Sequence, residues 1–177
     1  MILLACAVVV ACLLSGTTCA PLACENLIRP LVDIPLDHLE GTWALVGSSL
    51  NRSLDEDALK TRDSVTFVST NSTFVQRNRI GDKCQSSTLN VTKQGHVMTL
   101  TGANYVFTAT FHHTSCETCL LFRFDVQSAS HNTTDLYIVS TKRELDAGVK
   151  EEFAAQAKCL GLPEPIWMDP TKELCQS

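Results

Sequence analysis

The stretch Leu39-Glu40-Gly41-Thr42-Trp43 marks the point where the strands of this chain begin. Gly41 permits a tight turn, because a residue without a side chain is not restricted in φ. Trp43 then opens an apolar stretch, Ala44-Leu45-Val46, that is typical of a β-strand. A Gly-x-Trp tripeptide is common by chance. It gains meaning here from its place, between an N-terminal apolar segment and a long series of short strands.

The N-terminal segment is expected to be a signal peptide over residues 1–20. It contains the apolar runs 2–4 and 8–10, followed by small residues. It lacks a positively charged start, and an uncut signal acting as an anchor is the alternative. The apolar run is short for a membrane span. We therefore expect no stable membrane insertion, secretion into plasma or another body fluid, and one domain over residues 21–177.

Composition and motifs exclude several classes of function. The formal net charge is −5, and no basic stripe is interleaved with aromatic residues, so we expect no nucleic-acid partner. The chain has no Gly-x-Ser-x-Gly, His-Glu-x-x-His or phosphate-loop motif, so we expect neither catalytic residues nor a cofactor. His112 and His113 face opposite ways on a strand and cannot easily share a site with His96. We therefore expect no metal site.

The cysteines indicate an extracellular domain with disulfides. Three of nine lie within residues 1–20, and an even number remains. The remaining six are Cys24, Cys84, Cys116, Cys119, Cys159 and Cys175. A redox Cys-x-x-Cys pair needs a helix N-terminus, but Cys116 and Cys119 lie between two strand-like runs. We expect a structural link in a hairpin turn there, and the spacing leaves the other pairings open.

Four Asn-x-Ser/Thr sequons predict a glycoprotein, with the acceptors Asn51, Asn71, Asn90 and Asn132. Asn90 lies within a strand pattern. Its side chain should therefore face outward, and Leu89 and Val91 should face inward.

Eight short apolar and β-branched runs, separated by turn residues, predict an all-β domain. They are residues 42–50, 64–69, 73–80, 86–92, 96–101, 105–112, 119–126 and 135–141. Eight antiparallel strands can close into a barrel that is wide enough for one small ligand. The period then changes to that of a helix, in which Asp146 is the expected cap and Val149, Phe153, Ala157 and Leu160 form one stripe. This helix should pack outside the barrel.

Together these features resemble the lipocalins. The likeness rests on Gly41-Thr42-Trp43, the eight strands, the following helix, and the basic residues after Leu136–Thr141. The resemblance implies an eight-stranded up-and-down barrel with a C-terminal helix outside it. It also implies that Lys142, or alternatively Arg143, packs on Trp43 and closes the barrel. Only Phe124-Asp125-Val126 resembles the family's middle motif.

Within the lipocalins the chain most resembles the alpha-1-acid glycoprotein group and its fish relatives, the tributyltin-binding and the pufferfish saxitoxin- and tetrodotoxin-binding proteins. The matching stretches are Pro21–Leu27, Leu36–Trp43, Lys158–Pro163 and Lys172–Cys175. This likeness implies the disulfides Cys24–Cys159, Cys84–Cys175 and Cys116–Cys119. It implies a monomeric carrier of a drug-, toxin-, steroid- or organotin-like molecule. The alternatives are an apolipoprotein M-like lipid carrier and a protein of acute-phase or immune-modulating type that acts through its glycans or loops. One lipocalin group is enzymatic through a free thiol, which six paired cysteines would not provide.

Strand alternation predicts which residues line the barrel. The expected ligand contacts are Phe74, Gln76, Asn78, Leu89, Val91, Phe107, Phe122, Phe124 and Tyr137. The polar members need partners in the interior, and a ligand or water can supply them. This mixture suits an amphiphilic or weakly cationic ligand. Two alternatives stay open for the fifth strand, in which either Val97, Thr99 and Thr101 or His96, Met98 and Leu100 face inward. In the sixth strand the face that includes Phe107 and Phe111 is preferred.

Overall fold

The computed structural model describes residues 23–50, 62–68, 72–80, 82–102, 106–127 and 132–175. The expected signal peptide 1–20 and the sequons at Asn51 and Asn71 lie outside these residues. No helix within the described ranges has the length and apolar character needed to cross a membrane.

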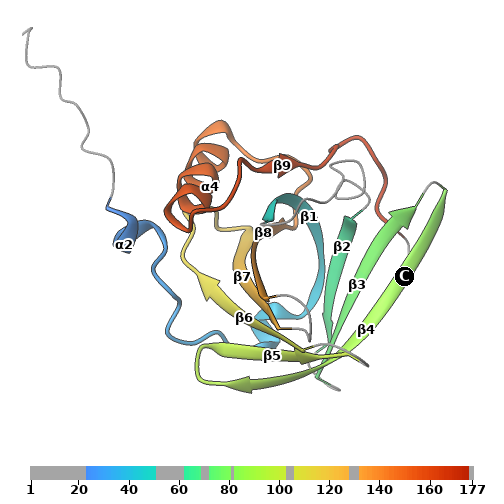
Figure 1. Cartoon of the computed structure of the whole chain (residues 1–177). Coiled ribbons are helices and arrows are strands. Elements are labelled where there is room, and N and C mark those ends of the chain that lie inside the picture. Colours follow the sequence, from blue (N-terminus) through green and yellow to red (C-terminus); the bar gives the residue numbers. More distant parts are fainter. Residues whose placement is uncertain are drawn as a thin grey trace, which may run out of the picture.

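Eight antiparallel strands form a closed barrel (Figure 1). They are β1 (Gly41–Leu50), β2 (Arg62–Val68), β3 (Thr73–Ile80), β4 (Lys83–Gln94), β5 (Val97–Thr101), β6 (Val106–His112), β7 (Cys119–Gln127) and β8 (Asn132–Ser140). Each strand pairs with the next in the chain, and β1 closes the ring by pairing with both β2 and β8. The up-and-down barrel expected from the sequence is confirmed, with strand ends shifted by a few residues.

The barrel interior holds the larger of two apolar clusters, to which every strand contributes. On β5, Met98 and Leu100 are buried to 2 % and 0 % exposure, so they, and not Val97 and Thr99, face the interior. On β6, Ala109 and Phe111 are buried and belong to the same cluster. Both faces of β5 carry apolar residues, and alternation alone therefore could not orient it.

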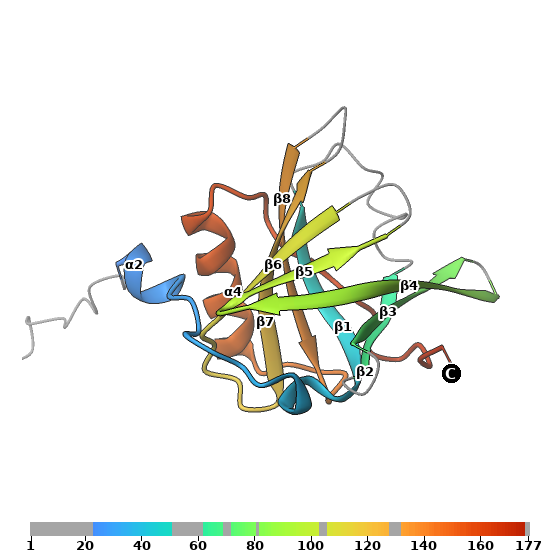
Figure 2. The same cartoon turned by 90° about the horizontal axis from the view of Figure 1, so that it is seen from below.

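The N-terminal segment covers one end of the barrel (Figure 2). It begins with α2 (Cys24–Leu27) and ends in η1 (Leu36–Leu39), a single turn of 3-10 helix. Leu39 is 1 % exposed within the interior cluster. The Trp43 indole N–H donates to the Leu39 carbonyl at 3.0 Å, which ties the first strand to this turn.

The C-terminal end of β6 and the residue that follows it hold the N-terminal segment through three contacts. The Leu31 amide donates to the Phe111 carbonyl at 2.9 Å, and the His113 amide donates to the Arg29 carbonyl at 3.0 Å. The His112 ring nitrogen Nδ1 lies 2.8 Å from the Ile28 carbonyl. Backbone pairing therefore anchors the cover of this barrel end, in addition to apolar packing.

Helix α4 (Ala147–Cys159) packs on the outer wall of the barrel, as expected. Phe153 and Ala157 are buried against Leu121, Leu136 and Ile138 of β7 and β8. Asp146 occupies the N-cap position, but its side chain makes no capping hydrogen bond. The expected cap is therefore correct in place and wrong in mechanism, because packing of the apolar stripe holds the helix instead.

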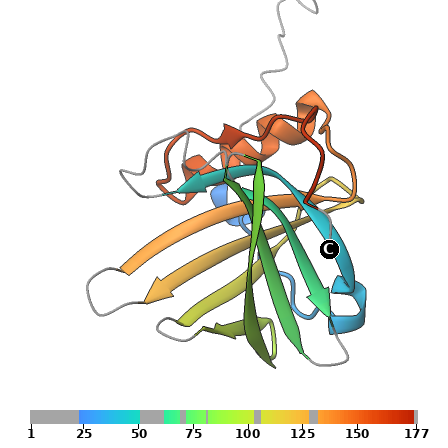
Figure 3. The ribbon, with the colours of Figure 1, turned by 90° about the vertical axis from the view of Figure 1, so that its right-hand side faces the viewer.

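A ninth strand, β9 (Ile166–Trp167), was not expected from the sequence. It pairs with Gly47 and Ser48 of β1, beyond the residues 41–44 that pair with β2. Trp167 packs against Phe153 of α4, with ring centroids 5.5 Å apart. Ile166 and Met168 pack against the interior cluster. Figure 3 shows α4 and β9 on the same side of the barrel.

Three disulfides link the elements, in the pairing that the resemblance implied: Cys24–Cys159, Cys84–Cys175 and Cys116–Cys119. The first joins α2 to α4. The second joins the C-terminal segment to β4, and the third closes the β6–β7 turn. The long loops closed by the first two, 135 and 91 residues, constrain the unfolded chain most.

Substitution of Gly47 should loosen β9. A Cβ at Gly47 would lie 2.6 Å from Trp167 Cζ3 and 3.0 Å from Ile138 Cγ2. Gly47→Ala should therefore lower the free energy of unfolding by about 1–3 kcal/mol, a typical cost of overpacking. Gly148→Ala is the control, since among the described residues no atom outside the helix backbone lies within 4 Å of that Cβ, and it should stabilise helix α4 by about 0.5–1 kcal/mol. Urea unfolding measures both, and equal effects would contradict the close packing of Trp167.

The attachment of the N-terminal segment should depend on pH through His112. Burial, the largest cause, lowers the pKa of His112, and Arg123 and His113 lower it further, while the hydrogen bond to Ile28 and the charge of Asp125 oppose this. The Nε2 atom is buried and has no hydrogen-bond partner among the described residues, so protonation would bury an unsatisfied donor.

The direction of the pH dependence of stability follows from the lowered pKa of His112. The unfolded chain takes up the His112 proton near pH 6.5, while the native chain resists it until a lower pH. The free energy of unfolding should therefore fall as the pH drops below about 6.5, and the loss should level off below the lowered native pKa. Urea titrations between pH 5 and 7 measure this slope. His112→Gln should flatten it, whereas His38→Gln, at an exposed position of η1, should not. An unchanged slope in His112→Gln would count against this origin.

Candidate ligand-binding site

Four aromatic rings from β3, β7 and β8 meet in the middle of the barrel. Phe122 and Phe124, two residues apart on β7, lie with ring centroids 4.9 Å apart. Phe74 meets Phe124 edge-on at 6.3 Å, and Tyr137 lies 5.4 Å from Phe124. Because strand side chains alternate, one apolar face of each strand is enough to build this group.

A cavity lies beside these rings. It is small, and the space that a water-sized sphere can enter is about 20 Å³. Its lining residues are Leu45, Arg62, Asp63, Ser64, Val65, Phe74, Gln76, Arg77, Phe122, Phe124 and Tyr137. This is room for about one or two water molecules, so a ligand with a ring enters only when the lining side chains move apart.

Arg62 is one of several lining residues that were not expected from the sequence, together with Leu45, Asp63, Ser64, Val65 and Arg77. On β2, Arg62 pairs with Asn78 and Ser64 pairs with Arg77, so Asp63 is an extra residue in a β-bulge. Alternation counted back from Val65 would place Arg62 on the outer face, and the bulge reverses this. An Arg62 N–H donates to the Tyr137 hydroxyl, and the guanidinium carbon lies 5.0 Å from the centre of the Tyr137 ring.

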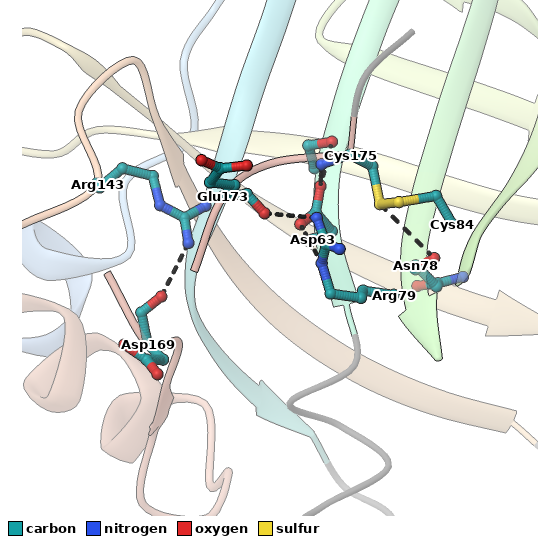
Figure 4. A network of polar contacts seen from close by, with 9 residues as sticks. Asp63, Asn78, Arg79, Cys84, Arg143, Asp169, Glu173 and Cys175 are labelled. Carbon is teal, nitrogen blue, oxygen red and sulfur yellow. Dashed lines mark hydrogen bonds and ion pairs between the residues drawn. A yellow bond between two sulfur atoms is a disulfide. The ribbon is translucent and has the colours of Figure 1, made fainter. Parts of the chain in front are cut away.

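The C-terminal segment holds this bulge in place (Figure 4). Asp63 is 6 % exposed, and its Oδ2 accepts the Cys175 amide at 2.8 Å and the Ser64 hydroxyl at 3.0 Å. Arg79 Nε lies 4.0 Å from the other carboxylate oxygen, and Arg79 Nη2 donates to the Glu173 carbonyl at 2.6 Å. The buried carboxylate thereby receives the donors it needs, and one wall of the cavity is fixed from outside the barrel.

Further polar groups lie at the barrel end opposite η1. Gln76 Nε2 donates to Asn78 Oδ1 at 3.3 Å, one strand away from Arg62. The Tyr137 hydroxyl donates to Asp135 Oδ2 at 3.4 Å, and Asp135 is 2 % exposed. A chain of donors therefore runs from Arg62 through the Tyr137 hydroxyl to Asp135.

The structure brings five of the predicted contact residues together around the cavity: Phe74, Gln76, Phe122, Phe124 and Tyr137. Asn78 lies opposite Arg62, and the Phe107 ring lies 5.8 Å from that of Phe124. Leu89 and Val91 are buried in the interior cluster, outside this cavity. Contact of any of these residues with a ligand stays a prediction.

Trp43 and Lys142, the two residues expected to close the barrel, lie in different surroundings. Trp43 is half-buried at the η1 end, with its indole N–H on Leu39. Lys142 is exposed, and its backbone amide donates to the Ser140 hydroxyl at 3.0 Å. The alternative, Arg143, donates to the Asp169 carbonyl at 2.8 Å. Packing of a cation on Trp43 stays a prediction.

The remaining predicted positions lie at the surface or outside the described residues. Asn90 and Asn132 are exposed, as carriers of glycans must be, and their occupancy stays a prediction. In the part of the chain that the structure describes, no group of three His, Cys, Asp or Glu residues is placed to hold a metal ion. The six described cysteines are all in disulfides.

Comparison with known proteins supports the fold. No protein-family model matches the chain, and no curated protein sequence matches it. Among solved structures, lipocalin 12 from rat epididymis superposes with a TM-score of 0.67 at 16 % identity, over 84 % of this chain and 93 % of that one. The odorant-binding protein OBP1 gives 0.64 at 14 % identity, over 82 % of this chain and 100 % of that one. The closed eight-stranded barrel with its C-terminal helix is thus a lipocalin-type fold.

Proposed function

We propose that this chain is a lipocalin that binds and carries one small hydrophobic or amphiphilic molecule inside its barrel. The observation that carries the proposal is the cavity, in which aromatic walls meet a few polar groups that converge from β2, β3 and β8. Natural ligand sites combine an apolar lining with a few placed polar groups in this way. No catalytic step is part of the proposal.

We further propose that the chain belongs to the alpha-1-acid glycoprotein group and is secreted, glycosylated and monomeric. The three disulfides are consistent with an oxidising compartment, and the exposed Asn90 and Asn132 are consistent with glycosylation. The ligand class in that group includes drug-, toxin-, steroid- and organotin-like molecules. The structural neighbour OBP1 is named for odorant binding.

Two measurements test the carrier function. Native mass spectrometry of protein from its natural source should show one small molecule bound to each chain. The neutral dye N-phenyl-1-naphthylamine should bind the purified protein at one site per chain, with increased fluorescence in an apolar environment. A barrel that is empty by mass spectrometry and does not bind the dye would contradict the proposal, and would favour action through glycans or loops.

Filling the cavity should weaken dye binding. Gln76 lines the cavity, so Gln76→Trp should weaken the dye by at least about tenfold, which corresponds to about 1.4 kcal/mol. Gln94→Trp is the matched control, because Gln94 is an exposed glutamine at the end of β4 and does not line the cavity. Thermal unfolding of both variants shows whether the fold is intact. Equal binding by the two variants would place the dye elsewhere.

A further inference from the structure

We propose that the first half of β4 is a docking edge for a second copy of this chain, whose own β4 pairs with it antiparallel about Ser86. The inference goes beyond the carrier function and does not depend on it. It makes the proposed monomer the low-concentration form of an equilibrium between one copy and two. The observations that carry it are the backbone pairing of β4, the exposure of its residues and its uncharged side chains.

Strand β4 is paired on both sides along only part of its length. On one side it pairs with β3 from Lys83 to Asn90 without a register shift. On the other side it pairs with β5 only from Asn90 to Gln94. Among the residues that the structure describes, no strand pairs with residues 83–89 on that side. Figure 2 shows the β3–β4 hairpin extending past the end of β5.

The backbone groups on this free edge can be assigned from one hydrogen bond. The Val91 amide donates to the Ser72 carbonyl at 2.7 Å, on the β3 side of the strand. Successive residues of a strand turn their backbone groups to opposite neighbours, so the odd-numbered residues of β4 face β3 and the even-numbered residues face the other side. The even-numbered residues of the free edge are Cys84, Ser86 and Thr88. Each therefore offers one N–H and one C=O to a further strand.

The free edge lacks the features that usually protect a strand from pairing. Natural proteins guard such edges with lysines, prolines or bulges. Here Lys83, next to the hairpin turn, is the only charged residue in 83–89, and no proline occurs in 83–94. The pairing with β3 has no bulge, and residues 83–88 are all exposed. The edge is therefore open to another strand.

The free edge is also held in shape before a partner arrives. The Cys84–Cys175 disulfide fastens the start of β4 to the C-terminal segment (Figure 4). That segment is bound to β2 in turn, because the Cys175 amide donates to Asp63 at 2.8 Å. An edge that is ordered in advance loses less conformational freedom on binding.

A second copy fits this edge because the edge is self-complementary. When Ser86 of one copy lies opposite Ser86 of the other, Cys84 lies opposite Thr88, and the free backbone groups of both copies meet. The side chains that face each other there are small and uncharged. The two Lys83 side chains would lie about 20 Å apart, six residues along the strand, where salt screens their repulsion. A symmetric contact of this kind closes at two copies.

The contact is short, so the dimer should be weak. One short run of backbone pairing belongs to the small interfaces that form transient complexes. Each copy also carries a formal charge of −5, which opposes association at low salt. A glycan on Asn90 would leave the edge accessible, because strand side chains stand perpendicular to the sheet and not along its plane.

Sedimentation of the secreted protein at increasing concentration tests the inference. Between about 5 µM and about 500 µM, the average mass should rise from that of one copy toward that of two. Ser86→Lys places two cations opposite each other and should weaken association by at least about tenfold. Gln94→Lys is the matched control, because it adds the same charge at an exposed position of β4 that pairs with β5. It should change association by less than about threefold.

A charge exchange tests the register. A fluorescently labelled Ser86→Lys chain should bind the Ser86→Glu chain at least about tenfold more tightly than it binds unlabelled Ser86→Lys, because opposite charges then meet at the symmetry axis. A labelled Gln94→Lys chain should bind Ser86→Glu and unlabelled Gln94→Lys within about threefold of each other.

The outcomes are decisive in both directions. An unaltered chain that stays a single copy throughout this range overturns the inference. Equal effects of Ser86→Lys and Gln94→Lys, or a charge exchange without preference, overturn it as well, because the contact then lies elsewhere. A selective loss in Ser86→Lys that Ser86→Glu reverses supports it.

Folding and carrier function are checked separately. Near-UV circular dichroism shows whether each variant is folded, and N-phenyl-1-naphthylamine should bind Ser86→Lys as it binds the unaltered chain, since Ser86 does not line the cavity. If Ser86→Lys does not fold, Ser86→Pro decides, because it removes an N–H on the free side of an edge strand, where proline is tolerated. Dye binding by a chain that never dimerises would overturn the docking edge and leave the carrier function standing.

Discussion

The barrel depends on which neighbouring strand pairs with each part of β1. It pairs with β8 from Ala44 to Leu50, but with β2 only from Gly41 to Ala44. Beyond that point β2 diverges, and β9 takes its place beside Gly47 and Ser48. An unpaired edge at this position would leave backbone groups without partners next to an apolar interior. Gly47 makes the arrangement possible, since any side chain there would occupy the space of the Trp167 ring.

The same divergence links the C-terminal segment to the site. Once β2 leaves β1, its first residues are held by the segment that follows β9, through Asp63 and the amide of Cys175. The Cys84–Cys175 disulfide fastens that segment to β4, across β2 and β3. The bulge at Asp63 is therefore held by the C-terminal segment as well as by β2 itself. The orientation of Arg62 follows from the bulge, so a contact outside the barrel determines a charge inside it.

These features explain which parts could be predicted from the sequence. Strong period-two patterns, such as Leu120, Phe122 and Phe124, fix both a strand and its inner face, and the stripe through Phe153 fixes the helix. Arg62 could not be found this way, because one inserted residue inverts the alternation. Strand β9 has two residues, too few for any period, and it exists only because β1 leaves an edge there. The fifth strand carries at least one apolar residue on each face, Val97 on one and Met98 and Leu100 on the other, so its orientation depended on packing.

A cation over an aromatic ring at the cavity, as Arg62 is over Tyr137, is costly unless something compensates for its lost hydration. Tyr137 provides part of the compensation, through its hydroxyl and its ring, and Asp135 extends it by one hydrogen bond. The barrel maintains this arrangement with rigid elements: β8 carries Tyr137 and Asp135, and the C-terminal segment fixes β2 through Asp63. The polar groups are thus oriented before a ligand enters, so less ordering remains to be done on binding. Preorganisation of this kind favours a ligand whose polar group matches the hydrogen-bonding groups that are already in place.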